Sequence, residues 1–188
     1  MRPAELAELA LVEAHRAFVD DVRGLTIEEA LAAAGGYRSI LGIAKHCAAW
    51  SAVYRSYAFD TDPRAWDRTE WPRGLVDRIE PTQEYLDEIV SWFESTYERW
   101  VLALRGSDPT TLVPLHWGAT APLAEVVAMV STHWAYHAGE INAILAIVRG
   151  EAWEYTEEVE ENHIPTAGHG VRPAWMTDDE AARFERDR

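Results

Sequence analysis

The stretch S-T-H-W-A-Y-H-A-G-E-I-N-A-I-L-A-I-V-R-G, residues 131–150, determines how the rest of the sequence is interpreted. It is rich in Ala, Ile, Leu and Val, yet it carries His133 and His137 four residues apart. Residues at i and i+4 of an α-helix lie on one face, about 5–6 Å apart at Cβ. The face shared by the two histidines is otherwise an apolar stripe: Val126, Met129, Val130, Ile141 and Ile144. Apolar neighbours cannot hydrogen-bond two neutral imidazoles, whereas a divalent metal accepts a lone pair from each ring.

A third histidine, His46, interrupts an apolar stripe of another predicted helix. That stripe consists of Ile43, His46, Trp50, Val53 and Tyr57. A single histidine on an apolar face is usually a satisfied core residue, but a pair on one core stripe and a third on another favour a metal site. Three histidine ligands leave positions open to water or substrate, which is typical of catalytic sites. The HExxH peptidase motif is absent because Trp134 stands where its glutamate would be.

Helical periodicity of apolar residues predicts four long helices, with no strand-like alternation in any of them. Their expected ranges are 3–23, 39–57, 82–105 and 122–149. Thr26 and Glu29 resemble a capping box over a short additional helix, and Gly150 ends the last long one. The sequence therefore predicts an all-α four-helix bundle over residues 1–150. Residues 151–188 are expected to form an acidic C-terminal arm that packs on the bundle or on a partner subunit.

Composition limits the classes of function. The 188 residues are 48% hydrophobic with nine tryptophans, which indicates a packed core rather than a disordered chain. A formal net charge of −15 disfavours nucleic acid and anionic membranes as partners. Cys47 is the only cysteine, so no intramolecular disulfide is expected. Acidic residues interrupt the N-terminus and no apolar run approaches about 20 residues, so we expect a cytoplasmic protein.

The segments L-G-I-A-K-H-C-A-A-W (41–50) and H-W-A-Y-H-A-G-E-I (133–141), separated by a long loop and a third helix, resemble the DinB/YfiT-like superfamily. The resemblance covers residues 1–150 and implies an up-down-down-up four-helix bundle. It also implies that His46, His133 and His137 bind a metal, commonly zinc or nickel. Some relatives are thiol-dependent S-transferases or isomerases that use mycothiol, bacillithiol or glutathione, and many have no known activity.

Glu140 is the candidate catalytic residue, since it follows His137 by three positions. The family often has glutamine there, so a carboxylate replaces an amide. Glu140 can orient a ligand imidazole, bind the metal or act as a base. Alternatively, it is a solvated glutamate at the bundle rim or pairs with an arginine.

Other candidates have weaker support. Cys47 is expected to be a small core residue, and His15 to have a core or rim role, although it is the rival for third ligand. His116 lies in a loop, and His163 and His169 belong to the arm.

The leading interpretation is a metal-dependent enzyme that activates a thiol cofactor for transfer to, or isomerisation of, a small molecule. Mycothiol is the first thiol to test, because all but one of the 17 basic residues are arginine and alanine is abundant, as in GC-rich bacterial genomes. The alternatives are a metal-dependent hydrolase and a non-catalytic, metal-braced stress-response or binding protein. The last long helix is apolar nearly all round, so Trp134, Ala138 and Leu145 are expected at a homodimer interface or under the arm.

Overall fold

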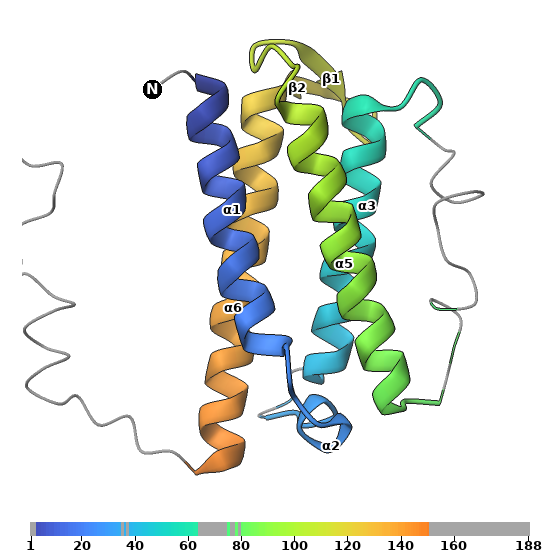
Figure 1. The fold of residues 1–188 in the computed structure, drawn as a ribbon, viewed down its shortest axis with the longest axis vertical. Coiled ribbons are helices and arrows are strands. Elements are labelled where there is room, and N and C mark those ends of the chain that lie inside the picture. Colours follow the sequence, from blue (N-terminus) through green and yellow to red (C-terminus); the bar gives the residue numbers. More distant parts are fainter. Residues whose placement is uncertain are drawn as a thin grey trace, which may run out of the picture. The chain divides into compact units, whose positions relative to one another are not determined.

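The structure is a computed structural model that describes residues 3–34, 36, 38–63, 75, 78 and 80–150. Four long helices form a bundle (Figure 1), which confirms the predicted all-α class. They are α1 (Pro3–Val22), α3 (Ile40–Phe59), α5 (Gln83–Leu104) and α6 (Leu123–Arg149). The described elements also include a short helix, α2 (Ile27–Ala30), and a hairpin of β1 (Leu112–Pro114) and β2 (Thr120–Pro122). The predicted arm, residues 151–188, lies outside the described residues.

Local side-chain caps fix where the helices begin, as the sequence predicts. Thr26 and Glu29 form the expected capping box at α2. Ser39 accepts a hydrogen bond from the Gly42 amide at the start of α3, and Thr82 accepts one from the Tyr85 amide at α5. Each cap satisfies a backbone N–H that has no partner within its helix. Gly150 ends α6 in a left-handed conformation with φ of 65°, which glycine adopts without strain.

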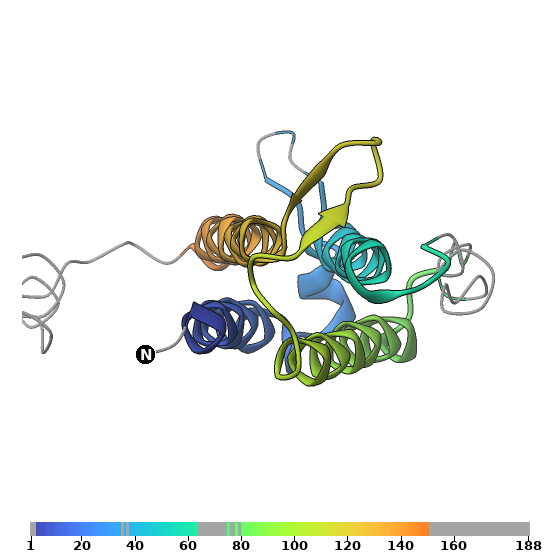
Figure 2. The same cartoon turned by 90° about the horizontal axis from the view of Figure 1, so that it is seen from above.

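The four helices lie at the corners of a square when viewed along the bundle (Figure 2). Helix α6 packs against α1 and α3, and α5 packs against the same two helices. Helices α3 and α5 run in one direction and α1 and α6 in the other (Figure 1), which is the expected up-down-down-up order. None of the helices in the described ranges is long and apolar enough to cross a bilayer.

The core corrects the expectation about the last helix. Trp134 is completely buried, Ala138 is 4% exposed and Leu145 is 6% exposed, all within a single chain. The Trp134 ring meets Phe93 edge-on, with centroids 4.9 Å apart. The assignment of Trp134, Ala138 and Leu145 to an interface was wrong because α6 has two helical neighbours, so two of its faces are covered inside the bundle. The homodimer remains a prediction, but these three residues no longer support it, because they are buried within one chain.

The β1–β2 hairpin was not predicted, because each of its strands has only three residues. Leu112 pairs with Pro122 and Pro114 with Thr120, in antiparallel register. The turn uses Gly118 at φ of 90°, a conformation that favours glycine. Strand β1 packs against α3 and β2 against α6. The hairpin therefore spans the two helices that carry the histidines.

Candidate metal centre

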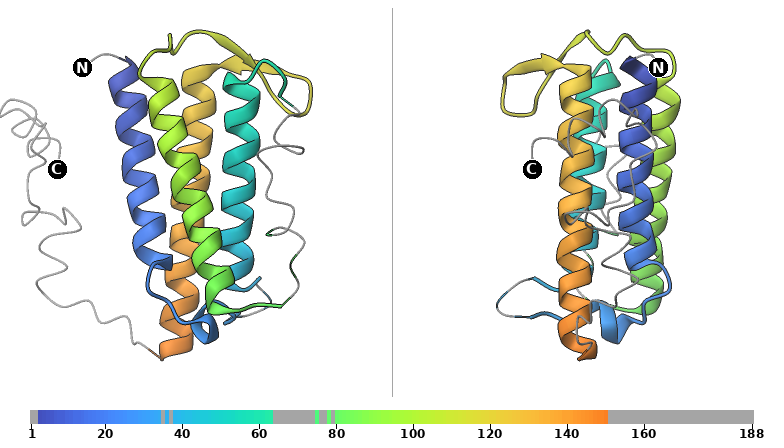
Figure 3. Two further views of the ribbon diagram at one scale, coloured as in Figure 1. Left: turned by 45° about the vertical axis from the view of Figure 1, so that its right-hand side comes forward. Right: turned by 90° about the vertical axis from the view of Figure 1, so that its left-hand side faces the viewer.

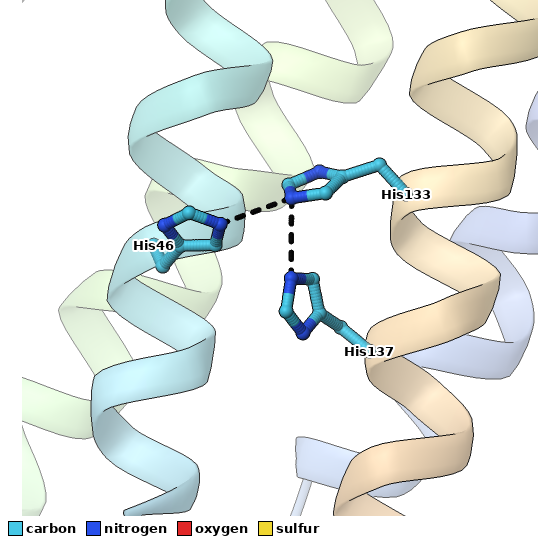
Figure 4. A group of neighbouring side chains, drawn as sticks. All are labelled: His46, His133 and His137. Atoms are coloured by element: carbon cyan, nitrogen blue, oxygen red, sulfur yellow. Dashed lines mark hydrogen bonds between the residues drawn. The ribbon is translucent and has the colours of Figure 1, made fainter. Parts of the chain in front are cut away.

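Three histidine side chains converge between α3 and α6. His46 comes from α3, and His133 and His137 come from successive turns of α6 (Figure 4). One ring nitrogen of each lies within 4.8 Å of the others. His137 is buried, while His46 and His133 are half-buried. The three histidines predicted from the sequence thus form one cluster, two of whose members are partly exposed.

The nitrogen positions suit a metal better than hydrogen bonds. His133 Nε2 lies 3.0 Å from His46 Nε2 and 3.2 Å from His137 Nε2. A neutral imidazole nitrogen carries one hydrogen or one lone pair, so His133 Nε2 cannot make a separate linear hydrogen bond to each neighbour. Zinc–nitrogen bonds of about 2.0–2.1 Å in a tetrahedral site place ligand nitrogens about 3.3–3.4 Å apart. The donor set and spacing therefore fit a divalent ion bound by three Nε2 atoms.

Glu140 contacts the other side of the His137 ring. Its Oε2 lies 2.7 Å from His137 Nδ1, and its side chain is only 13% exposed. A carboxylate that accepts the Nδ1–H bond leaves the lone pair of the same ring on Nε2, directed at the cluster. This contact places Glu140 where it can orient a ligand, rather than in open solvent.

Comparison with known protein families gives a match. The family model of the DinB superfamily matches residues 10–141, which include all three histidines and Glu140. The chain belongs to the DinB superfamily. No curated protein and no solved structure gives a significant match to this DinB-superfamily chain.

Burial favours the neutral form of two of the clustered histidines of this DinB protein, His46 and His133. Burial lowers the pKa of His46 to about 4, with further lowering by the charges of Arg38 and His137. Burial also lowers the pKa of His133 to about 4, and His137, His46 and Arg38 add to that effect. Neutral imidazoles at physiological pH have the free lone pairs that a metal requires.

His15, the rival third ligand, lies elsewhere in the core. Its ring stacks on Tyr97, with centroids 3.6 Å apart, and on Phe93 at 5.6 Å. It is not part of the three-histidine cluster. Burial lowers the pKa of His15 to about 4. Half-buried against aromatic rings of α5, it occupies a position that agrees with the expected core or rim role.

Cys47 is fully buried and contributes to the core, as expected. Burial raises the pKa of its thiol well above the usual range, which disfavours a nucleophilic thiolate. His163 and His169 lie outside the described residues.

Two features of the site were missed in the sequence. His116, on the hairpin, packs against Trp50 of α3 with ring centroids 4.8 Å apart, and Trp50 in turn lies edge-on to His46. Arg38, just before α3, acts electrostatically on His46 and His133. Arg38 precedes the N-cap, Ser39, so helical spacing gave no signal that its charge would act on His46. The hairpin and the segment leading into α3 both project on the α6 side, at opposite ends of the bundle (Figure 3).

Proposed function

We propose that the protein binds a divalent ion, zinc or nickel, through His46, His133 and His137, and that it catalyses thiol-dependent transfer to, or isomerisation of, a small molecule. The observation that supports this is the convergence of the three Nε2 atoms. Nε2 of His133 lies 3.0 Å from Nε2 of His46 and 3.2 Å from Nε2 of His137. No arrangement of one proton per ring gives every nitrogen its own linear hydrogen bond, whereas a metal uses all three lone pairs.

The surrounding residues supply orientation and access. Glu140 holds the His137 ring with Nε2 toward the cluster. A divalent ion at this position supplies Lewis acidity, which makes a thiol or water nucleophilic near neutral pH. His46 and His133 are half-buried, so the cluster is accessible to a ligand that approaches between α3 and α6.

A thiol cofactor is supported by membership of the DinB superfamily and by the nature of the cysteine in this chain. Cys47 is buried with its pKa raised, so it is a poor source of thiolate. A low-molecular-weight thiol would provide the nucleophile instead. Mycothiol is the first candidate, and a reducing, cytoplasmic location suits such a cofactor.

Metal analysis of purified variants tests the centre. We expect about one equivalent of zinc or nickel in the parent protein. His133→Ala and His137→Ala should each lose it with helical content largely intact, because the bundle has its own apolar core. His46→Gln should weaken binding far more than His15→Gln, the matched control on α1. Retention of metal by all three ligand variants would refute the centre, and loss in His15→Gln alone would refute the choice of third ligand.

A thiol screen tests the reaction. The metal-loaded protein is incubated with mycothiol, bacillithiol or glutathione and an electrophilic reporter such as monobromobimane, and thiol consumption is followed. We expect acceleration with at least one thiol, and loss of that acceleration in His46→Gln. Equal rates in parent and variant for every thiol would contradict a transferase. Ester hydrolysis under the same conditions would indicate a hydrolase, and no activity at all would indicate a structural metal.

A further inference from the structure

A pocket of about 460 Å³ runs along α6 beside the metal centre. Its walls are mostly apolar or small residues, among them Ala34, Tyr136, Gly139, Ala143 and Ile147. Tyr136 is 65% exposed and Ile147 is 67% exposed. Apolar pockets of about 300–1,000 Å³ with few polar groups are typical of small-molecule sites.

Glu140 joins this pocket to the three histidines. It is the charged residue of the pocket lining, and its Oε2 also contacts His137 Nδ1 at 2.7 Å. Tyr136, Glu140, Ala143 and Ile147 recur at spacings of four, three and four, so they form one stripe of the helix. A ligand lying along this stripe would place one end at the cluster and the other in the pocket.

Arg38 contributes a positive charge near the start of α3, about one helical turn from His46. Its side chain lies over Gly42, where an added Cβ would be 3.7 Å from Arg38 Cβ and 3.9 Å from Arg38 Cδ. Gly42 and His46 are four residues apart on one face of α3, so Arg38 approaches the cluster along that face. A divalent ion and Arg38 together outweigh the single negative charge of Glu140, and the site therefore favours an anion.

We propose that the pocket binds the apolar part of an organic anion whose charged head, a carboxylate, lies between Arg38 and the histidine cluster. The position of the head rests on the proposed metal centre. The apolar pocket does not, because its walls are formed by the protein alone.

Calorimetric titration of the zinc-loaded, full-length protein tests the pocket. The probes are propionate, 3-phenylpropionate and the uncharged 3-phenylpropanol. Burial of the ring should make 3-phenylpropionate bind at least about tenfold more tightly than propionate. Gly139→Leu should remove that advantage by filling the pocket. A Cβ at position 139 meets nothing within 4 Å, so the fold accepts the change. Ala128→Leu, at an exposed position of α6 outside the pocket, is the control and should retain the advantage.

Charge variants test the class of ligand. Arg38→Gln should weaken 3-phenylpropionate binding about five- to tenfold and leave 3-phenylpropanol unchanged. Arg16→Gln, which removes an exposed arginine on α1, should change neither. No effect of Arg38→Gln would overturn the anionic head. The pocket would be overturned, even if zinc binds, by either of two results. One is equal affinity for 3-phenylpropionate and propionate, and the other is a tighter binding of 3-phenylpropionate that persists in Gly139→Leu. Failure to bind zinc would overturn the proposed function instead, and the effect of Gly139→Leu on 3-phenylpropanol would then decide the pocket.

Discussion

At the scale of single residues, the contact between Glu140 and His137 has the greatest consequence for the site. The Nδ1–H bond to a carboxylate selects one imidazole tautomer and raises the basicity of Nε2. The family often has an amide at this position, and an amide oxygen accepts the same bond with less charge. We therefore expect Glu140 to act as a positioning residue, through its contact with Nδ1 of His137.

Removal of this carboxylate should weaken metal binding. We expect Glu140→Ala to lower the affinity for zinc about 10–100-fold, because the ring loses its partner. Glu140→Gln should have a smaller effect, since its amide oxygen still accepts the bond. Competition with a chromophoric chelator measures both. Glu125→Ala, at an exposed position in the first turn of α6, is the control. Equal affinities for Glu140→Ala and the parent would show that Glu140 does not orient a ligand.

Asp21 provides a second prediction at this scale. Burial raises its pKa to about 6 from 3.8, and the hydrogen bond from Asn142 Nδ2 opposes the rise. Between about pH 4 and 6 the folded chain keeps a proton that the unfolded chain releases, so the free energy of unfolding falls as pH rises. Asp21→Asn should therefore be more stable than the parent at pH 7, with a smaller difference at about pH 4. Urea unfolding at both pH values measures this. A difference that grows toward acid pH would contradict it.

At the scale of the helical elements, α3 holds His46 in place. Its buried face includes Ile40, Ala44, Cys47 and Ser51, so small residues let it pack closely. His46 and Trp50 lie at the edge of that face and are half-buried. The hairpin covers Trp50 through His116.

The N-cap of α3 should contribute measurably to stability. Ser39→Ala removes the acceptor of the Gly42 amide and should cost about 1 kcal/mol of unfolding free energy. Ser95→Ala is the control, because Ser95 is exposed within α5 and alanine is a better helix former. Urea denaturation compares the two. Equal stabilities for both variants would show that Ser39 contributes no cap.

At the scale of the whole molecule, the bundle depends on large aromatic side chains buried between its helices. Trp100 and Trp134 are both fully buried, and the Trp100 indole donates a hydrogen bond to the Ser51 carbonyl at 3.2 Å. Trp134 packs with Phe93 and Tyr97 of α5 across the bundle. This packing supports the backbone of α6 directly beside His133.

Truncation of Trp134 tests its place in the core. Trp134→Ala should cost about 3–5 kcal/mol of unfolding free energy, from lost burial and the cavity left behind. The loss should not depend on protein concentration, since the contacts lie within one chain. Trp117→Ala, at a ring that is 54% exposed, is the control and should change stability little. A small effect of Trp134→Ala, or one that appears only at concentrations where the chain dimerises, would restore the interface interpretation.

The sequence by itself determined the features that depend on local geometry. Caps at Ser39 and Thr82 and the shared face of His133 and His137 follow from contacts within one or two helical turns. Tertiary structure alone decided how each helix is rotated. In this bundle α6 contacts both α1 and α3, so periodicity cannot tell which of its apolar faces is covered, and Trp134 was misplaced for that reason. The contact of His116 with Trp50 likewise depends on how the hairpin packs on α3, because these two residues are distant in sequence and meet only in the folded chain.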